Sequence, residues 1–182
     1  DFVELPGRKS PVMISADDSS ALAFAPFATS YFPLIVVEVG PRGRMQLARD
    51  LMQSKLPGQP PPICATPAPS SNTWLRGRCG EFTTTRRQER LAQVKARLSD
   101  VKATRSADKQ KWEDYVDRNV TGLVDAELNR YAYTGHGGAG LRWLETIWPG
   151  NDEMKAKLVH ELRQTHAKSA FAEDLAALAA GR

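Results

Sequence analysis

A proline-rich stretch at residues 57–72, PGQPPPICATPAPSSN, constrains the fold of this 182-residue chain more than any other feature. The stretch contains six of the chain's 12 prolines. Proline fixes the φ angle and has no backbone N–H, so closely spaced prolines interrupt helices and are excluded from central strands. We therefore expect an extended, polyproline-like linker here, which separates an N-terminal arm (residues 1–72, linker included) from a helical domain at residues 73–182.

The part of the chain before the linker is expected to be extended. Residues 1–40 show little helical periodicity, and prolines interrupt them repeatedly. One short strand is expected at Tyr31–Val39, where β-branched residues are frequent. Residues 43–56 predict a short amphipathic helix, because three leucines fall roughly on one face. These leucines are Leu47, Leu51 and Leu56.

The apolar stretch Ala21–Val37 raises the question of a membrane segment. It contains 17 residues, and Pro26 and Pro33 interrupt it. That length is the short limit for a helix that crosses a bilayer. We therefore expect a strand or an extended apolar arm, and contact of residues 21–37 with a membrane is an alternative.

The C-terminal half is expected to be α-helical. Thr85 and Gln88 fit a capping box at the start of a helix. The apolar residues that follow have a 3-4-3 spacing, which is typical of the inward face of an amphipathic helix. They are Leu91, Val94, Leu98 and Val101. A second helix, or a kinked continuation of the first, is expected to bury Trp112, Val116, Val120, Leu123 and Leu128.

Two further helices are expected after residue 140. A short one would end at Pro149, and a final one would begin at Asn151 or Asp152. Their inward residues are Leu141, Leu144, Ile147 and Trp148, then Met154, Leu158, Leu162 and the apolar side of an alanine-rich end. The predicted fold class is mainly α: an extended proline-rich arm with at most one short strand, followed by three to four helices.

Residues 135–140, GHGGAG, match the letters of the dinucleotide fingerprint G-x-G-x-x-G. That site also needs a preceding strand and an acidic residue about 20 positions later within a βαβ unit, whereas helices are expected on both sides here. An esterase oxyanion loop would need a G-x-S-x-G nucleophile, which the sequence lacks. We therefore expect no cofactor and interpret the segment as a hinge between helices, with a small anion site as the alternative. Its candidate residues are Gly135, His136, Gly137, Gly138 and Gly140.

Basic residues are concentrated in the middle of the chain. Residues 75–112 carry 11 Lys or Arg against 4 Asp or Glu, a net charge of +7. The corresponding counts are 6 and 6 for residues 1–74, and 8 and 11 for residues 113–182. A basic block of this kind binds phosphate, an acidic protein surface or anionic lipid, or is simply a solvated helix face. The candidate partner- or phosphate-binding residues are Arg76, Arg78, Arg86, Arg87, Arg90, Lys95, Arg97, Lys102 and Arg105.

Histidines and cysteines do not predict a metal site. His160 and His166 are six positions apart, so on a helix they point to different faces. Two cysteines are too few for a four-ligand zinc site. Cys64 and Cys79 form either one disulfide or two unrelated thiols, and the sequence leaves these alternatives open.

The sequence most favours a non-catalytic accessory subunit of a large multi-protein assembly. An arm without its own core needs a neighbouring surface to offset its ordering entropy, so we expect other protein subunits as partners of the arm and the basic helix. One alternative is an RNA- or DNA-contacting protein of the ribosome-associated type that uses residues 76–105. Another is an enzyme with a site at residues 135–140. The first residue is not methionine, and we expect an organelle, mitochondrion or plastid, after removal of a targeting segment.

Overall fold

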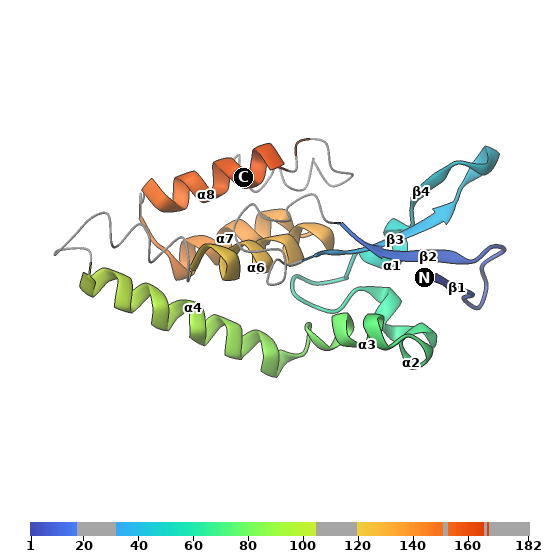
Figure 1. The fold of residues 1–182 in the computed structure, drawn as a ribbon, viewed down its shortest axis with the longest axis horizontal. Coiled ribbons are helices and arrows are strands. Elements are labelled where there is room, and N and C mark those ends of the chain that lie inside the picture. The colour runs from blue at the N-terminus through green and yellow to red at the C-terminus, as the bar shows by residue number, and fades with distance from the viewer. Residues whose placement is uncertain (18–31, 105–119, 151–152, 166, 168–182) are drawn as a thin grey trace.

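Strands and helices both contribute to the structure, so the fold is mixed α and β (Figure 1). The computed structural model describes residues 1–17, 32–104, 120–150, 153–165 and 167. A four-stranded antiparallel sheet built from N-terminal residues forms one end of the molecule, and helices form the other. The prediction of a mainly α fold with an extended arm is therefore wrong.

The sheet has its strands in chain order and antiparallel throughout: β1 (Phe2–Val3), β2 (Val12–Ala16), β3 (Leu34–Val39) and β4 (Met45–Leu47). Alternate side chains are buried on β2, at Val12 and Ile14, and on β3, at Leu34 and Val36. This alternation is typical of a sheet with one face on a core. β3 confirms the strand expected at Tyr31–Val39. β2 and β4 pair with β3, and β1 pairs with β2, because unpaired backbone N–H and C=O groups beside apolar side chains are unfavourable.

Residues 43–56 do not form the predicted amphipathic helix. They contain β4 and then a single helical turn, α1 (Arg49–Met52). Leu47 lies opposite Val37 in the sheet, and Leu56 is 58% exposed. Leucines at helical spacing fit a strand equally well where a neighbouring strand offers backbone hydrogen bonds.

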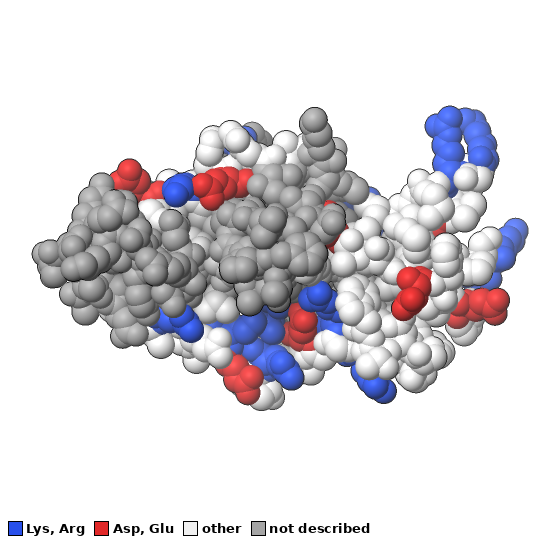
Figure 2. All heavy atoms as spheres, in the orientation of Figure 1, with Lys and Arg blue, Asp and Glu red and all other residues white. Residues whose placement is uncertain are grey.

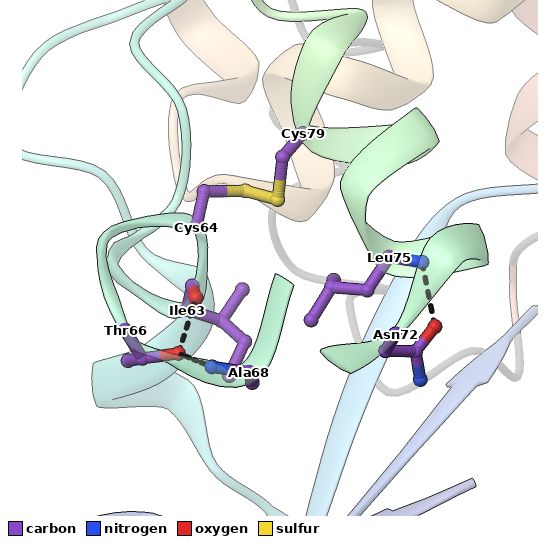
Figure 3. Close-up of a disulfide and its surroundings, with 7 residues drawn as sticks. All are labelled: Ile63, Cys64, Thr66, Ala68, Asn72, Leu75 and Cys79. Carbon is purple, nitrogen blue, oxygen red and sulfur yellow. Dashed lines mark hydrogen bonds between the residues drawn. A yellow bond between two sulfur atoms is a disulfide. The ribbon is translucent and has the colours of Figure 1, made fainter. Parts of the chain in front are cut away.

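The proline-rich stretch folds into short helical turns, and the expected polyproline linker is absent from it. The turns η3 (Pro62–Ala65) and α2 (Ala68–Ser71) each carry a proline at their first or second position, where an N–H has no intrahelical partner. Ile63 is fully buried, and the hydroxyl of Thr66 accepts the backbone N–H of Ala68 at 3.3 Å (Figure 3). Prolines therefore begin the turns here instead of preventing them.

A disulfide joins Cys64 to Cys79, which resolves the alternatives that the sequence left open (Figure 3). It connects η3 to α3 (Thr73–Gly80) across a sequence separation of 15. The side-chain oxygen of Asn72 caps α3 by accepting the N–H of Leu75 at 2.9 Å. The bridge thus fixes α3 against the turns that precede it.

Removal of this disulfide is expected to destabilise the chain by about 3 kcal/mol, because a closed loop of roughly 15 residues restricts the unfolded state by that amount. Cys64→Ser/Cys79→Ser should unfold at a correspondingly lower urea concentration. Reductant should lower the midpoint of the wild-type chain and leave that of the double variant unchanged. Equal midpoints for the oxidised and reduced wild-type chain would contradict this expectation.

The helices predicted for the C-terminal half are present where the structure describes them. They are α4 (Thr84–Thr104), α6 (Gly122–Tyr133), α7 (Gly137–Ile147) and α8 (Glu153–Thr165). α6 and α7 lie between α8 on one side and α4 on the other (Figure 1). The predicted inward residues Trp112 and Val116, the caps Asn151 and Asp152 and the alanine-rich end fall outside the described residues.

The predicted inward face of α4 is confirmed for Val94 and Leu98, which are buried, and Leu91 is half-buried. The helix begins slightly earlier than the capping box predicted, since the hydroxyl of Thr83 accepts the N–H of Arg86 at 3.4 Å. On α8 the three predicted core residues are all buried. They are Met154, Leu158 and Leu162.

One hydrophobic cluster joins the sheet to the helices. It includes Val36 of β3, Ile63 of η3, Val94 of α4, Leu128 of α6 and Leu158 of α8. The division of the chain at residue 72 stays a prediction.

The apolar stretch at residues 21–37 lies only partly within the described residues. β3 contains its last four residues, and residues 18–31 lie outside the described part of the chain. None of the helices in the described ranges combines the length and the apolar character needed to cross a bilayer.

Candidate functional site

A cleft of about 710 Å³ lies between α4 and the α6–α7 pair. Leu91 of α4, Leu123 and Tyr131 of α6, and Trp143 of α7 line it, and the loop at residues 57–60 contributes to its wall. Most of these side chains are apolar or aromatic. We call this space the α4–α6 cleft.

α6 turns one of its faces toward the α4–α6 cleft. Leu123, Glu127 and Tyr131 follow at intervals of four and therefore lie above one another on the helix. The rings of Tyr131 and Trp143 have centroids 6.1 Å apart and planes at 40°, a tilted arrangement common among packed aromatic rings. This four-residue spacing is visible in the sequence, but none of the three residues is among the predicted site residues.

An ion-pair network includes Arg90 and Glu127, the two charged residues of the cleft wall. Glu127 Oε2 accepts hydrogen bonds from Arg90 Nε and Arg130 Nη1, both at 3.2 Å. Arg130 Nη2 donates to Glu81 Oε2 at 3.0 Å. The side chains of Glu127 and Arg130 are only 7% and 8% exposed. Charges this buried need close partners, because each loses several kcal/mol of hydration.

Arg90 is the basic residue of the network that lines the α4–α6 cleft. Burial lowers the pKa of its guanidinium, the charge of Arg130 lowers it further, and Glu127 acts in the opposite direction. Arginine has such a high ordinary pKa that the group remains a cation at neutral pH. Its Nη2 also donates to the backbone carbonyl of Glu81 at 2.7 Å. Arg90 thus presents a fixed and already paired positive charge.

Two of the predicted phosphate- or partner-binding residues are turned toward acidic groups of the same chain. Arg90 pairs with Glu127, and Arg78 Nη1 pairs with Glu81 Oε1 at 3.2 Å. The guanidinium of Arg78 also lies over the ring of Trp74, 5.3 Å from its centroid. These contacts stabilise the positions of α3, α4 and α6.

The remaining basic candidates do not converge on one point. Arg76, Arg86 and Lys95 are exposed, and Arg97 is half-buried. Figure 2 shows basic side chains gathered over α3 and α4, along the lower side of the molecule. The side chains of Arg87 and Lys102, and the whole of Arg105, fall outside what the structure describes.

The glycine segment is a helix start preceded by one left-handed turn residue. α7 begins at Gly137, so Gly137, Gly138 and Gly140 lie inside the helix, and Gly135 has a φ of +80°. His136 Nε2 is 2.8 Å from the carbonyl oxygen of Ser54. The N–H of Ser54 in turn donates to the carbonyl of the neighbouring Thr134 at 3.2 Å. The segment is therefore held against the loop that follows α1, and its role as a hinge or an anion site stays a prediction.

Gly135→Ala is expected to destabilise the chain by about 1–2 kcal/mol. Its positive φ is unfavourable for an L-residue, and an added Cβ would lie 3.1 Å from Cγ of Gln53. Thermal unfolding should show a lower midpoint. Gly77→Ala in α3 is the matched control, because nothing lies within 4 Å of its Cβ position and alanine favours a helix. A Gly135→Ala midpoint at or above that of the wild-type chain would contradict the expectation.

Asp125 is a further buried residue that is not among the predicted site residues. It lies on α6, is 4% exposed, and burial raises the pKa of its carboxyl to about 8. Asn129 Nδ2 donates to its Oδ1 at 2.8 Å. The sequence alone does not reveal such a residue, because a buried neutral aspartic acid and an exposed aspartate have the same one-letter code.

No protein-family model, curated protein or solved structure matches this chain. Within the described ranges, no three His, Cys, Asp or Glu side chains are grouped so that they could hold a metal ion.

Proposed function

We propose that this chain is a non-catalytic accessory subunit that binds a segment of a partner protein in the α4–α6 cleft. The lining of the cleft carries the proposal: apolar and aromatic side chains surround about 710 Å³. The ion pair between Arg90 and Glu127 already satisfies much of the charge on its wall. Concave apolar surfaces with a few polar groups are the usual binding sites of proteins, and apolar anchors in such pockets supply most of the binding energy.

Charge favours a partner segment with acidic residues beside its apolar anchors. α4 forms one wall of the cleft, and Arg86 and Lys95 are exposed on this helix. Complementary charge accelerates association and fixes the orientation of the bound segment. The same two side chains would repel a positively charged partner segment.

Site-specific cross-linking in the native assembly tests this proposal. A photo-reactive residue at Gln88, which lines the cleft, should cross-link the partner protein. The same residue at Glu89 is the matched control, since this exposed neighbour is not part of the lining. Equal cross-linking from both positions, or a native chain that sediments as a monomer without any cross-link, would rule the proposal out.

We also propose that the subunit resides in an organelle, mitochondrion or plastid, in which its disulfide stays oxidised. The disulfide between Cys64 and Cys79 supports this, because such bridges persist where thiols are oxidised. Maleimide added to the native source should label neither cysteine before reduction and both after it. Labelling of both cysteines without reduction would exclude such a compartment.

A second candidate function is contact with nucleic acid through residues 76–105. The exposed side chains of Arg76, Arg86 and Lys95 favour it. Binding would then fall steeply with salt, and Arg76→Gln/Arg86→Gln would reduce both the affinity and its salt dependence. A chain without measurable affinity for single strands or duplexes would eliminate this candidate.

A further inference from the structure

The β3–β4 hairpin projects beyond the other strands of the sheet (Figure 1). β2 accompanies β3 only as far as Val37, which lies opposite Met13, whereas β3 continues beside β4 to Val39. The 3-10 turn η2 (Pro41–Gly43) closes the hairpin, and every residue of Pro41–Gln46 is exposed. The tip is therefore a two-stranded ribbon that stands clear of the described core.

The tip of the hairpin is positively charged. Arg42 and Arg44 are the charged residues between positions 39 and 47. Glu38, at the base of the hairpin, pairs with Arg8 and accepts a hydrogen bond from Gln46 Nε2 at 3.0 Å. Figure 2 shows the basic side chains of the hairpin as an isolated group at its projecting end. The charge of the tip is thus directed outward.

Arg42 has a backbone conformation that favours glycine. Its φ is 66° and its ψ is 22°, and it is the non-glycine residue with a positive φ among those the structure describes. Left-handed backbone is unfavourable for any side chain that has a Cβ, and such residues are concentrated at functional sites. A contact between the guanidinium and a binding partner would explain an arginine at a position suited to glycine.

An exposed apolar pair lies directly behind the arginines. Val39 and Met45 are opposite each other in the strand register and are 49% and 52% exposed. They occupy one face of the ribbon, because side chains alternate along a strand. The tip of the hairpin therefore presents two arginine side chains and two exposed apolar side chains.

We propose that the tip of the β3–β4 hairpin binds the major groove of duplex DNA. A two-stranded ribbon fits the major groove of B-form DNA, which is about 12 Å wide. Guanidinium groups such as those of Arg42 and Arg44 bind phosphates and the acceptor edge of guanine with paired hydrogen bonds. Val39 and Met45 are suited to thymine methyl groups. The proposal does not depend on the α4–α6 cleft.

The chemistry of the tip distinguishes duplex DNA from other anionic partners. Membrane-inserting tips and single-strand platforms use aromatic side chains, and residues 39–47 contain none. The major groove of A-form duplex RNA is too deep and narrow for side chains to read. Duplex DNA is the anionic partner whose groove admits the whole ribbon.

Fluorescence anisotropy with a labelled DNA duplex of about 20 base pairs tests the proposal on the full chain between about 50 and 200 mM salt. The wild-type chain should bind with an affinity that falls steeply with salt. Arg42→Gln/Arg44→Gln should weaken binding at least about tenfold and lower the slope of log affinity against log salt by about 2, because two charge contacts are lost.

Two further variants distinguish DNA binding by the hairpin from a general effect of positive charge and from an effect on folding. Lys55→Gln/Arg163→Gln removes the same charge from two exposed positions outside the hairpin and should weaken binding less than about threefold. Arg42→Gly should weaken binding about threefold or more while raising the thermal midpoint by a few degrees, since it relieves the left-handed conformation.

Several outcomes would overturn the proposal. They are the absence of duplex binding at every salt concentration, an equal loss of affinity in the two double variants, and tighter binding to duplex RNA than to duplex DNA. Binding to phosphatidylglycerol vesicles without binding to DNA would also overturn it and would assign the tip to a membrane surface.

Discussion

Raising the pH from about 4 to about 8 is expected to destabilise the folded chain by up to about 5 kcal/mol through Asp125 alone. Burial raises the pKa of this carboxyl to about 8 in the folded chain, whereas an unfolded aspartate titrates near 3.9. Between these values the folded state keeps a proton that the unfolded state has released. Each pH unit in this window therefore costs the folded state about 1.4 kcal/mol, and the loss is complete above about pH 8.

The surroundings of Asp125 explain why burial dominates. The hydrogen bond from Asn129 Nδ2 and the positive charge of Arg130 both favour the ionised carboxylate. Loss of hydration acts in the opposite direction and is larger, since only 4% of the residue is exposed. The carboxyl of Asp125 is thus mostly protonated at pH 7 in the folded chain.

Asp125→Asn is expected to remove this pH dependence. The amide stays neutral at every pH, and its oxygen can accept the same hydrogen bond from Asn129. Urea unfolding should give similar stabilities for both chains near pH 4 and a variant that is more stable by several kcal/mol at pH 8.5. Parallel pH profiles for the two chains would contradict the raised pKa. At pH 6 the wild-type chain should also show an infrared band of a protonated carboxyl that the variant lacks. Absence of this band from the wild-type spectrum would contradict the raised pKa as well.

The parts of the fold that follow from local spacing were predictable from the sequence. Val94 and Leu98 on α4, and Leu158 and Leu162 on α8, repeat at helical intervals, so each helix could be recognised from its own residues. The sheet could not be recognised in this way. Val12–Ala16 becomes a strand only because Leu34–Val39 lies beside it, and that partner is about twenty residues away in the chain.

The candidate site escaped prediction for the same reason. Arg90 and Glu127 are separated by 37 positions, so the sequence shows a basic helix and an unrelated acidic residue. The basic residues at 76–105 predicted a surface for external anions, whereas Arg78 on α3 and Arg90 on α4 meet carboxylates of the same chain. The prolines of residues 57–72 predicted an extended linker without helix, although the first turn of a helix accepts proline.

Glu127→Gln is expected to destabilise the chain by about 3 kcal/mol. The carboxylate lies between Arg90 and Arg130, 3.2 Å from a nitrogen of each, in a site where its side chain is 7% exposed. A neutral amide would leave two guanidinium charges facing each other with little water, and loss of one partner from a buried pair costs about 3–5 kcal/mol. The lower end applies because Glu81 still pairs with Arg130.

An exposed ion pair in the same chain provides the control for this prediction. Glu161 and Lys157 on α8 are 4.0 Å apart, and their side chains are 40% and 54% exposed. Glu161→Gln should therefore cost less than about 0.5 kcal/mol. Arg90→Gln/Glu127→Gln should recover part of the stability lost in Glu127→Gln, because the double variant removes the guanidinium that the single variant leaves without its carboxylate. Equal, small losses in the two single variants would mean that water reaches the cleft wall and that the network does not fix α4 against α6.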